Sequence, residues 1–354
     1  MKIGIITVPD AANFGSFLQA YSLQTVLEKL GHDVCFINGW DSKYVRKLYC
    51  NWIPKKRHLK HPYIFIAKNL FWKKERAYFL ENQKKLKLSD GNGENDYDLV
   101  LLGSDEIWNV KTEVFTKAAF YGGCYQNAAA FAVSAGEADY TDFLRYPDII
   151  EYIRNIADIY VRDDNTADIV KKITGKTPLK VCDPTFLVNK EELSDSIENE
   201  YLKSNRYIAV YSYSMSIPKQ NVDIIKKYAR SNGCRLVSVG MYNEWCDYNL
   251  LCAPLQFSAV LQGAEAVITN TFHGTVFSVL NEKKFAVIGN KIKICDLLKE
   301  FNLDSQRIET GRMSLELLTE TLQNNFINYN IIEEKIQKIR LISSGYLKKI
   351  IDKQ

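Results

Sequence analysis

The first candidate for chemistry is His273, one of only four histidines in the chain. Residues 269–275 read Thr-Asn-Thr-Phe-His-Gly-Thr and separate apolar residues 266–268, typical of a buried strand, from 276–280, typical of a helix. A turn of this kind offers backbone N–H groups to an anion, and Gly274 would let the backbone come close to a ligand. Histidine transfers protons near neutral pH. His273 is therefore a candidate catalytic residue, and the alternative is a structural role in the turn.

A second polar stretch, Gly103-Ser104-Asp105, follows the apolar residues 99–102. Asp105 could cap a following helix. It could equally accept a proton or a hydrogen bond from a substrate hydroxyl. The local sequence is compatible with both roles.

Arg162 directly follows the apolar residues 159–161. An arginine at the end of a strand is suited to phosphate or carboxylate, because its planar guanidinium can donate two parallel hydrogen bonds. The alternative is an ion pair with the adjacent Asp163 or Asp164.

Asn13, Gly15 and Ser16 stand where the first helix is expected to begin. Their backbone N–H groups could bind a phosphate or a carboxylate. The stretch lacks the Gly-x-Gly-x-x-Gly fingerprint and so gives little support to dinucleotide binding. An ordinary N-cap turn would explain the same residues.

Alternating strands and helices must position these side chains, a pattern typical of a parallel α/β sheet. Residues 14–31 have the apolar spacing of a helix, closed by Gly31. From about Thr319 the chain is expected to be helical to its end. Strands are expected at 2–8, 32–38, 97–103, 128–136, 156–163 and 179–188, and then at 207–214, 234–240, 266–270 and 284–289.

We expect two Rossmann-like domains facing a cleft, because 354 residues exceed the usual size of one domain. The polar residues 189–206 have the character of a linker. The predicted divisions are an N-terminal domain 1–190 with an insertion at 41–88, a C-terminal domain 205–318, and C-terminal helices 319–354.

Residues 41–88 carry fourteen Lys or Arg and three Asp or Glu, a local charge of +11 in a chain of net charge +4. Nine aromatic residues are interleaved with them. Such a segment could contact an anionic membrane surface. It could equally form amphipathic helices with solvated lysine faces. No apolar run reaches about 18 residues, so no transmembrane helix is expected.

Eight cysteines are scattered without a Cys-x-x-Cys pair, and most lie in apolar runs. This is typical of buried free thiols in a cytoplasmic protein. We expect no disulfide framework, and no metal site, because no cluster of ligands is evident.

Taken together, these segments resemble the polysaccharide pyruvyl transferase family, in order and spacing, from residue 1 to about 290. The matching pieces include GSDEIWN (103–109), VRDDNT (161–166), VCDPTFLV (181–188) and TFHGT (271–275). The resemblance implies a fold similar to GT-B glycosyltransferases, with the last helices crossing back to the first domain. It also implies transfer of the pyruvyl group of phosphoenolpyruvate to two sugar hydroxyls, which forms a cyclic ketal and releases phosphate.

The resemblance also implies residue roles. His273 would act as the acid or as a phosphate ligand, Arg162 as an anion clamp, and Asp105 as the base for the acceptor hydroxyl. The remaining candidates for substrate binding are Asn13, Gly15, Ser16, Gly103, Ser104, Thr271, Gly274, Thr275 and Lys293. Lys293 stands where many relatives have an arginine, and it keeps the charge but loses the bidentate geometry. Thr271 stands where serine or arginine is commoner.

Phosphoenolpyruvate is thus expected as a co-substrate, with no cofactor and no nucleic-acid partner. The acceptor would be a sugar of a cell-surface polysaccharide or of its precursor, for example one linked to undecaprenyl diphosphate. In that case 41–88 could bring a cytoplasmic enzyme to the inner membrane face. Two other functions fit the sequence: a GT-B-type glycosyltransferase with Arg162 and Lys293 on the diphosphate of a nucleotide sugar, and a non-catalytic component of a glycan-assembly complex.

Overall fold

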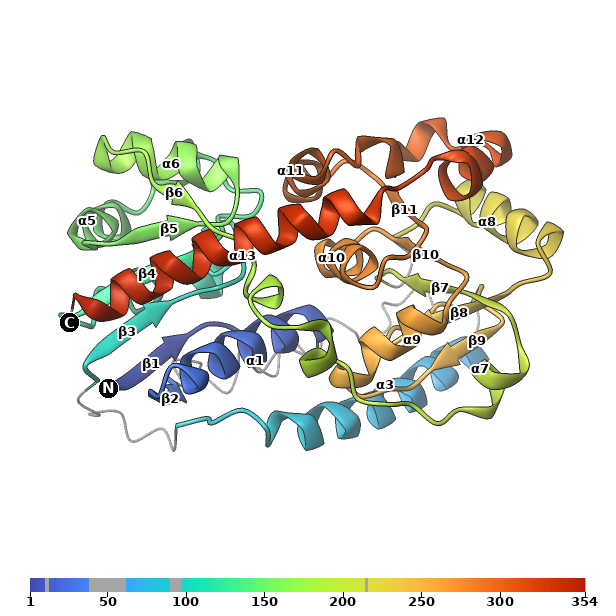
Figure 1. Cartoon of the computed structure of the whole chain (residues 1–354), viewed down its shortest axis with the longest axis horizontal. Coiled ribbons are helices and arrows are strands. Elements are labelled where there is room, and N and C mark those ends of the chain that lie inside the picture. The colour runs from blue at the N-terminus through green and yellow to red at the C-terminus, as the bar shows by residue number, and fades with distance from the viewer. Residues whose placement is uncertain (10–12, 38–61, 90–96, 214–215, 354) are drawn as a thin grey trace. The chain divides into compact units, whose positions relative to one another are not determined.

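The computed structural model describes residues 1–9, 13–37, 62–89, 97–213 and 216–353. The chain forms two compact units, and each is built on a six-stranded parallel sheet (Figure 1). Unit 1 comprises Met1–Tyr49, Gln83–Asn189 and Glu334–Gln354, and unit 2 comprises Cys50–Asn82 and Lys190–Glu333.

The sheet of unit 1 has the strand order β2-β1-β3-β4-β5-β6, so the order reverses between β1 and β3. Strand β3 is buried along its whole length, as expected of a parallel strand covered on both faces. The strands are β1 (Lys2–Ile6), β2 (Asp33–Phe36), β3 (Leu99–Leu102), β4 (Ala128–Val133), β5 (Ile159–Val161) and β6 (Leu179–Lys180). The helices are α1 (Phe14–Lys29), α4 (Tyr140–Phe143), α5 (Pro147–Asn155), α6 (Asp164–Thr174) and the part of α13 (Tyr329–Asp352) that starts at Glu334.

The sheet of unit 2 has the order β12-β11-β10-β7-β8-β9, which reverses between β7 and β10. Strands β7, β10 and β11 are buried throughout. The strands are β7 (Tyr207–Tyr211), β8 (Arg235–Val239), β9 (Tyr248–Leu250), β10 (Ala266–Thr269), β11 (Phe285–Ile288) and β12 (Arg307–Ile308). The helices are α3 (Pro62–Gln83), α7 (Glu200–Ser204), α8 (Lys219–Ser231), α9 (Phe257–Gly263), α10 (Phe272–Leu280), α11 (Ile292–Phe301) and α12 (Leu315–Thr319).

Side-chain caps fix where the helices that matter for the site begin. Asn13 precedes α1 and accepts from the Gly15 N–H at 2.9 Å, and Asp163 precedes α6 and accepts from the Thr166 N–H at 2.8 Å. Each cap satisfies a donor that the first turn of a helix would otherwise leave open. The caps therefore fix the start of α1 at Phe14 and that of α6 at Asp164.

The predicted alternation of strands and helices is confirmed, with two differences. The short edge strands β9 and β12 were not predicted, because two or three residues carry too little periodicity to recognise. The C-terminal region is not one continuous helix, since a π-helical turn at Glu320–Asn324 follows α12, and α13 begins only at Tyr329.

Helix α3 is the described part of the basic aromatic segment 41–88, whose residues 41–61 lie outside the described ranges. We predicted this segment as an insertion in the N-terminal domain, whereas its described residues from Pro62 to Asn82 belong to unit 2. The physical reason is aromatic packing and burial: the ring of Phe71 meets that of Tyr242 edge-on at 5.8 Å, and Phe71 and Phe79 are buried. No described helix is both long enough and apolar enough to cross a membrane.

Candidate functional site

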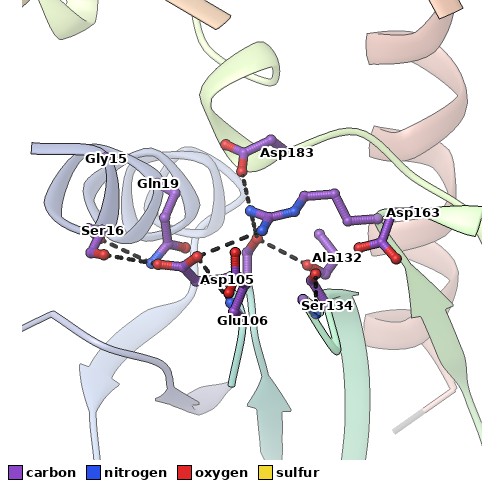
Figure 2. Close-up of polar contacts among 12 residues, drawn as sticks. Gly15, Ser16, Gln19, Asp105, Glu106, Ala132, Ser134, Asp163 and Asp183 are labelled. Carbon is purple, nitrogen blue, oxygen red and sulfur yellow. Dashed lines mark hydrogen bonds and ion pairs between the residues drawn. The ribbon is translucent and has the colours of Figure 1, made fainter. Parts of the chain in front are cut away.

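In unit 1, polar side chains gather where β1, β3, β5 and β6 end (Figure 2). Ser16 lies in the first turn of α1, Asp105 follows β3, Arg162 follows β5 and Asp183 follows β6. The strand order reverses between β1 and β3. In open α/β sheets, ligands bind at the carboxyl ends of the strands beside such a reversal. We call these four residues the Arg162 cluster.

Arg162 is held by carboxylates from two different loops. Its Nη1 donates to Asp183 Oδ2 at 2.6 Å, and its Nη2 lies 3.6 Å from Asp105 Oδ1. The side chains of Arg162 and Asp183 are 3% and 0% exposed. The predicted ion pairs with Asp163 or Asp164 are therefore replaced by pairs with distant residues, because Asp163 caps α6 and Asp164 pairs with Lys180 at 2.7 Å.

Asp183 is itself fixed by its neighbours. Its Oδ1 accepts from the backbone N–H and the hydroxyl of Thr185, at 3.1 and 2.8 Å. The carboxylate thus has one oxygen committed to its own turn and the other to the guanidinium. This arrangement holds Arg162 in one position.

Asp105 caps no helix; its backbone adopts φ = 80°, in the left-handed region. Its Oδ2 accepts from the Ser16 hydroxyl at 2.8 Å, and its Oδ1 accepts from the Glu106 N–H at 2.9 Å (Figure 2). The Ser16 contact links α1 to the loop after β3, and so spans the point where the strand order reverses. Hydrogen bonds and a nearby cation both favour the ionised form of a carboxylate.

The charge around Arg162 is negative overall. Burial by itself would lower the pKa of Arg162, but the nearby Asp183, Asp105, Asp163 and Glu106 outweigh it and raise the pKa. Asp183 and Asp105 pair with the guanidinium, and Asp163 and Glu106 add negative potential to it. Such surroundings disfavour a further anion and suit neutral hydroxyl groups, which carboxylates bind as hydrogen-bond acceptors.

The other residues predicted for this edge of the sheet shape its backbone, and Ser104 also contacts Arg162. Gly103 has φ = 119°, and a Cβ there would lie 2.3 Å from the Phe131 carbonyl oxygen, so only glycine fits. Ser104 is fully buried; its hydroxyl donates to the Ala132 carbonyl oxygen at 3.0 Å and accepts from Arg162 Nη1 at 3.5 Å. Asn13 is the N-cap of α1 and accepts from the Gly15 N–H. This agrees with the ordinary N-cap turn that was the alternative to phosphate binding for that stretch.

In unit 2, His273 lies in the first turn of α10, at the carboxyl end of β10. The residue is buried, with 8% of its surface exposed. Its ring meets the ring of Phe272 edge-on, with 5.3 Å between the ring centres. Strands β10 and β7 are the pair between which the strand order of this unit reverses. His273 therefore occupies in unit 2 the kind of position that Asp105 occupies in unit 1.

Neutral hydroxyl and amide groups tie the ends of β7 and β10 together. The Thr269 hydroxyl donates to the Tyr211 carbonyl oxygen at 2.7 Å, and the Asn270 amide donates to the Ser216 hydroxyl at 2.7 Å. Ser216 in turn lies 2.9 Å from the Ser212 hydroxyl. This network holds the turn before α10 without using a charged group.

Two lysines add positive charge at the start of α11. The Lys293 ammonium lies 5.5 Å from the centre of the Phe272 ring, and the Lys291 ammonium lies 5.5 Å from the centre of the Tyr213 ring. Both are cation–π distances. Phe272 contacts both His273 and Lys293, so these two predicted residues share one aromatic neighbour. We call His273, Lys291 and Lys293 the His273 cluster.

Three predicted residues near His273 have structural explanations. Gly274 was expected to admit a ligand, but a Cβ there would lie 2.1 Å from Thr269 Oγ1, so the space is filled by that hydroxyl. Thr271 caps α10 by accepting from the Gly274 N–H at 3.0 Å. Thr275 is fully buried and donates to the Thr271 carbonyl oxygen at 3.0 Å.

Sequence reasoning assigned no role to Asp183 or Lys291. Asp183 lies within the stretch 181–188 that matched the family, but nothing in the sequence relates it to Arg162, 21 residues earlier. Lys291 could have been found, because it stands two positions before Lys293 in the same turn. In the described ranges, no group of three or more His, Cys, Asp or Glu side chains could hold a metal ion, and the seven cysteines there are free thiols.

Solved structures with a similar fold include two bacterial epimerases. The putative UDP-N-acetylglucosamine 2-epimerase of Listeria monocytogenes has a TM-score of 0.51 at 11% identity, over 96% of this chain and 90% of that one. The UDP-GlcNAc 2-epimerase of Neisseria meningitidis, bound to UDP-GlcNAc, has a TM-score of 0.53 at 12% identity, over 100% of both chains. At these identities the likeness shows the fold alone. It agrees with the two parallel sheets and confirms the predicted GT-B-like α/β class.

A comparison with curated proteins finds no match. The family model for polysaccharide pyruvyl transferases matches residues 13–292, a range that contains the Arg162 cluster and all but one residue, Lys293, of the His273 cluster. With this match over most of its length, the chain belongs to the polysaccharide pyruvyl transferase family.

Proposed function

We propose that this protein transfers the pyruvyl group of phosphoenolpyruvate to two hydroxyls of one sugar, forming a cyclic ketal and releasing phosphate. The acceptor would be part of a cell-surface polysaccharide or of its lipid-linked precursor. The observation that carries the proposal is the His273 cluster, which combines a histidine with two lysines at the starts of α10 and α11.

The His273 cluster suits phosphoenolpyruvate because the donor carries a phosphate and a carboxylate. Helix N-termini and lysine ammonium groups both favour anions. Between Gly289 and Cys295 the only charged residues are Lys291 and Lys293, and both are cationic. We assign the donor to unit 2 on this ground.

The Arg162 cluster suits the acceptor because sugar hydroxyls are neutral donors and acceptors. Asp105 would receive the proton of the attacking hydroxyl, while Ser16 and Arg162 keep the carboxylate in place. Because the potential at Arg162 is already dominated by carboxylates, we assign this residue the role of positioning Asp105. From the sequence we expected Arg162 to bind the donor anion. We assign that role to Lys291 and Lys293 instead.

The reaction balances with these groups. Protonated His273 delivers a proton to the methylene carbon of phosphoenolpyruvate, and the first sugar hydroxyl forms a C–O bond to the neighbouring carbon and loses its proton to Asp105. The C–O bond to phosphate then breaks, and the second hydroxyl closes the ring and gives its proton to the departing phosphate. Asp105 then releases its proton to water and His273 takes one up, so that both groups return to their starting states. The products are the ketal and inorganic phosphate, and the cationic cluster stabilises the departing charge.

Phosphate release from phosphoenolpyruvate, with and without a galactose- or mannose-type acceptor, tests this proposal. His273→Gln keeps a hydrogen-bonding side chain but cannot deliver a proton as imidazolium does. We expect acceptor-dependent release by the wild type, and a fall in kcat of about 10²–10⁴-fold in the variant with little change in the affinity for phosphoenolpyruvate.

Loss of phosphoenolpyruvate affinity together with kcat would make His273 a phosphate ligand. No release with any acceptor, no binding of phosphoenolpyruvate, and binding of a UDP- or GDP-sugar instead would reject pyruvyl transfer in favour of glycosyl transfer.

A further inference from the structure

Helix α3 buries one face within the described part of the chain and exposes apolar side chains on the other. Phe71, Glu75 and Phe79 lie on the buried face and are 7%, 1% and 1% exposed. This face attaches the helix to unit 2, where Phe71 contacts Tyr242. Figure 1 shows α3 as the long light-blue helix.

The opposite face of α3 exposes large apolar side chains in a helical row. Tyr63, Ile66 and Leu70 are 68%, 57% and 56% exposed, and their spacing of three and four residues puts them on one side of the helix. Tyr78 and Leu80, at 45% and 46%, lie on the two flanks of this row. Five large hydrophobic residues on the outside of one helix are more than scattered surface exposure explains.

Basic residues lie within and beside this row. Lys73, Lys74 and Arg76 are all exposed, while the helix has a single exposed acidic residue, Glu81. Lysine and arginine can lay their methylene stems along an apolar surface and keep the charge in the headgroup region. Together Tyr63, Ile66, Leu70, Lys73, Lys74, Arg76, Tyr78 and Leu80 form what we call the outer face of α3.

We propose that the outer face of α3 binds the surface of an anionic lipid bilayer, with the helix lying parallel to the membrane. A helix of 22 residues is about 33 Å long, enough for an extended contact in the interface. Apolar side chains would enter the boundary between headgroups and acyl chains, and the three basic side chains would meet the lipid phosphates. Tyrosine is also enriched at membrane interfaces.

Charge complementarity favours a bilayer over a second copy of this chain. A symmetric contact between two outer faces would bring Lys73 and Lys74 against the same residues of the partner copy. Lysine is depleted at protein–protein interfaces, and like charges brought together repel. An anionic bilayer instead supplies the opposite charge over the whole surface.

Co-sedimentation of the full chain with vesicles tests this inference. One set of vesicles contains phosphatidylglycerol and phosphatidylcholine in equal parts, and the other contains phosphatidylcholine alone. We expect the wild type to sediment with the first set only, and to be released by added salt as the charges are screened. Lys73→Glu with Lys74→Glu, and separately Ile66→Ser with Leu70→Ser, should each lower the partition coefficient at least tenfold.

Matched variants on α13 separate the outer face of α3 from total charge and hydrophobicity. Lys348→Glu with Lys349→Glu changes the net charge equally, and Ile331→Ser with Leu341→Ser removes apolar side chains that are 51% and 76% exposed. Both should bind as the wild type does. Because every changed residue is exposed, thermal unfolding and transfer to a soluble acceptor are expected to be unaffected, so this test stands apart from that of the transferase activity.

Several results would overturn the inference. They are failure of the wild type to bind the anionic vesicles, equal binding to both kinds of vesicle, or equal loss in the α13 and α3 variants. A dimer in solution that the Ile66 and Leu70 substitutions dissociate would show instead that a second copy covers this face.

Discussion

The two candidate clusters occupy equivalent places in their sheets but differ in charge. In unit 1, a buried arginine pairs with two carboxylates, and two more add negative potential, at the reversal between β1 and β3. In unit 2, a histidine and two lysines stand at helix starts beside a network of neutral hydroxyls, at the reversal between β7 and β10. The same architecture thus presents one edge suited to neutral hydroxyls and another suited to an anion. Under the proposed function, topology would set where each ligand binds, and charge would select its class.

The largest effect on the free energy of unfolding is expected from a substitution in the Arg162 cluster. Asp183→Asn removes the charge that pairs with Arg162 at 2.6 Å in a buried setting. Loss of one partner of a buried ion pair typically costs about 3–5 kcal/mol in the free energy of unfolding. Urea denaturation would measure the loss, and Asp164→Asn, which removes an exposed partner of Lys180, should change little. A loss below about 1 kcal/mol would show that Asp105 alone can hold Arg162.

A smaller effect tests the cationic cluster in unit 2. Lys293→Ala should weaken the binding of phosphoenolpyruvate about tenfold, or about 1.4 kcal/mol, because it removes a charge beside His273. Lys293→Arg should restore binding, and Lys299→Ala, in the last turn of the same helix, is the matched control. Isothermal titration calorimetry at fixed salt would measure the affinities.

The affinity of Asp105→Asn for phosphoenolpyruvate, measured by the same calorimetry, tests whether the donor binds in unit 2 and not in unit 1. This change removes a negative charge from unit 1 and should leave the affinity for phosphoenolpyruvate unchanged. A clear gain in affinity would place the donor anion at Arg162 and contradict the division of roles between the two clusters.

The smallest effect concerns the hydrogen bond between Ser16 and Asp105. Ser16→Ala removes a 2.8 Å contact to the carboxylate, and should raise the KM for the acceptor about fivefold, equivalent to about 1 kcal/mol. Ser22→Ala removes a hydroxyl from the same helix that donates to the Leu18 carbonyl oxygen, and serves as the control. Steady-state kinetics with both substrates varied would check that the KM for phosphoenolpyruvate stays constant; a rise in that KM instead would link Ser16 to the donor.

Much of the fold could be predicted because its signals are local. Apolar runs such as 99–102 and 266–269 mark buried strands, and Asn13 and Asp163 mark helix starts within a few residues. The short strands β9 and β12 escaped prediction, because they exist only as additions to the edges of a sheet that is already formed. The attachment of α3 to unit 2 likewise depends on a contact between Phe71 and Tyr242, which are far apart in the chain.

The sequence by itself determined the α/β class, the family resemblance, and the candidate positions His273, Asp105 and Arg162 at strand ends, since these depend on residue type and short-range spacing. Only the tertiary structure decided what surrounds them. It paired Arg162 with Asp183 and Asp105 instead of its neighbours in sequence, and it used Gly274, Thr271 and Thr275 to build the turn. Electrostatic surroundings depend on distances in space, and parallel strands bring residues together that the chain keeps far apart.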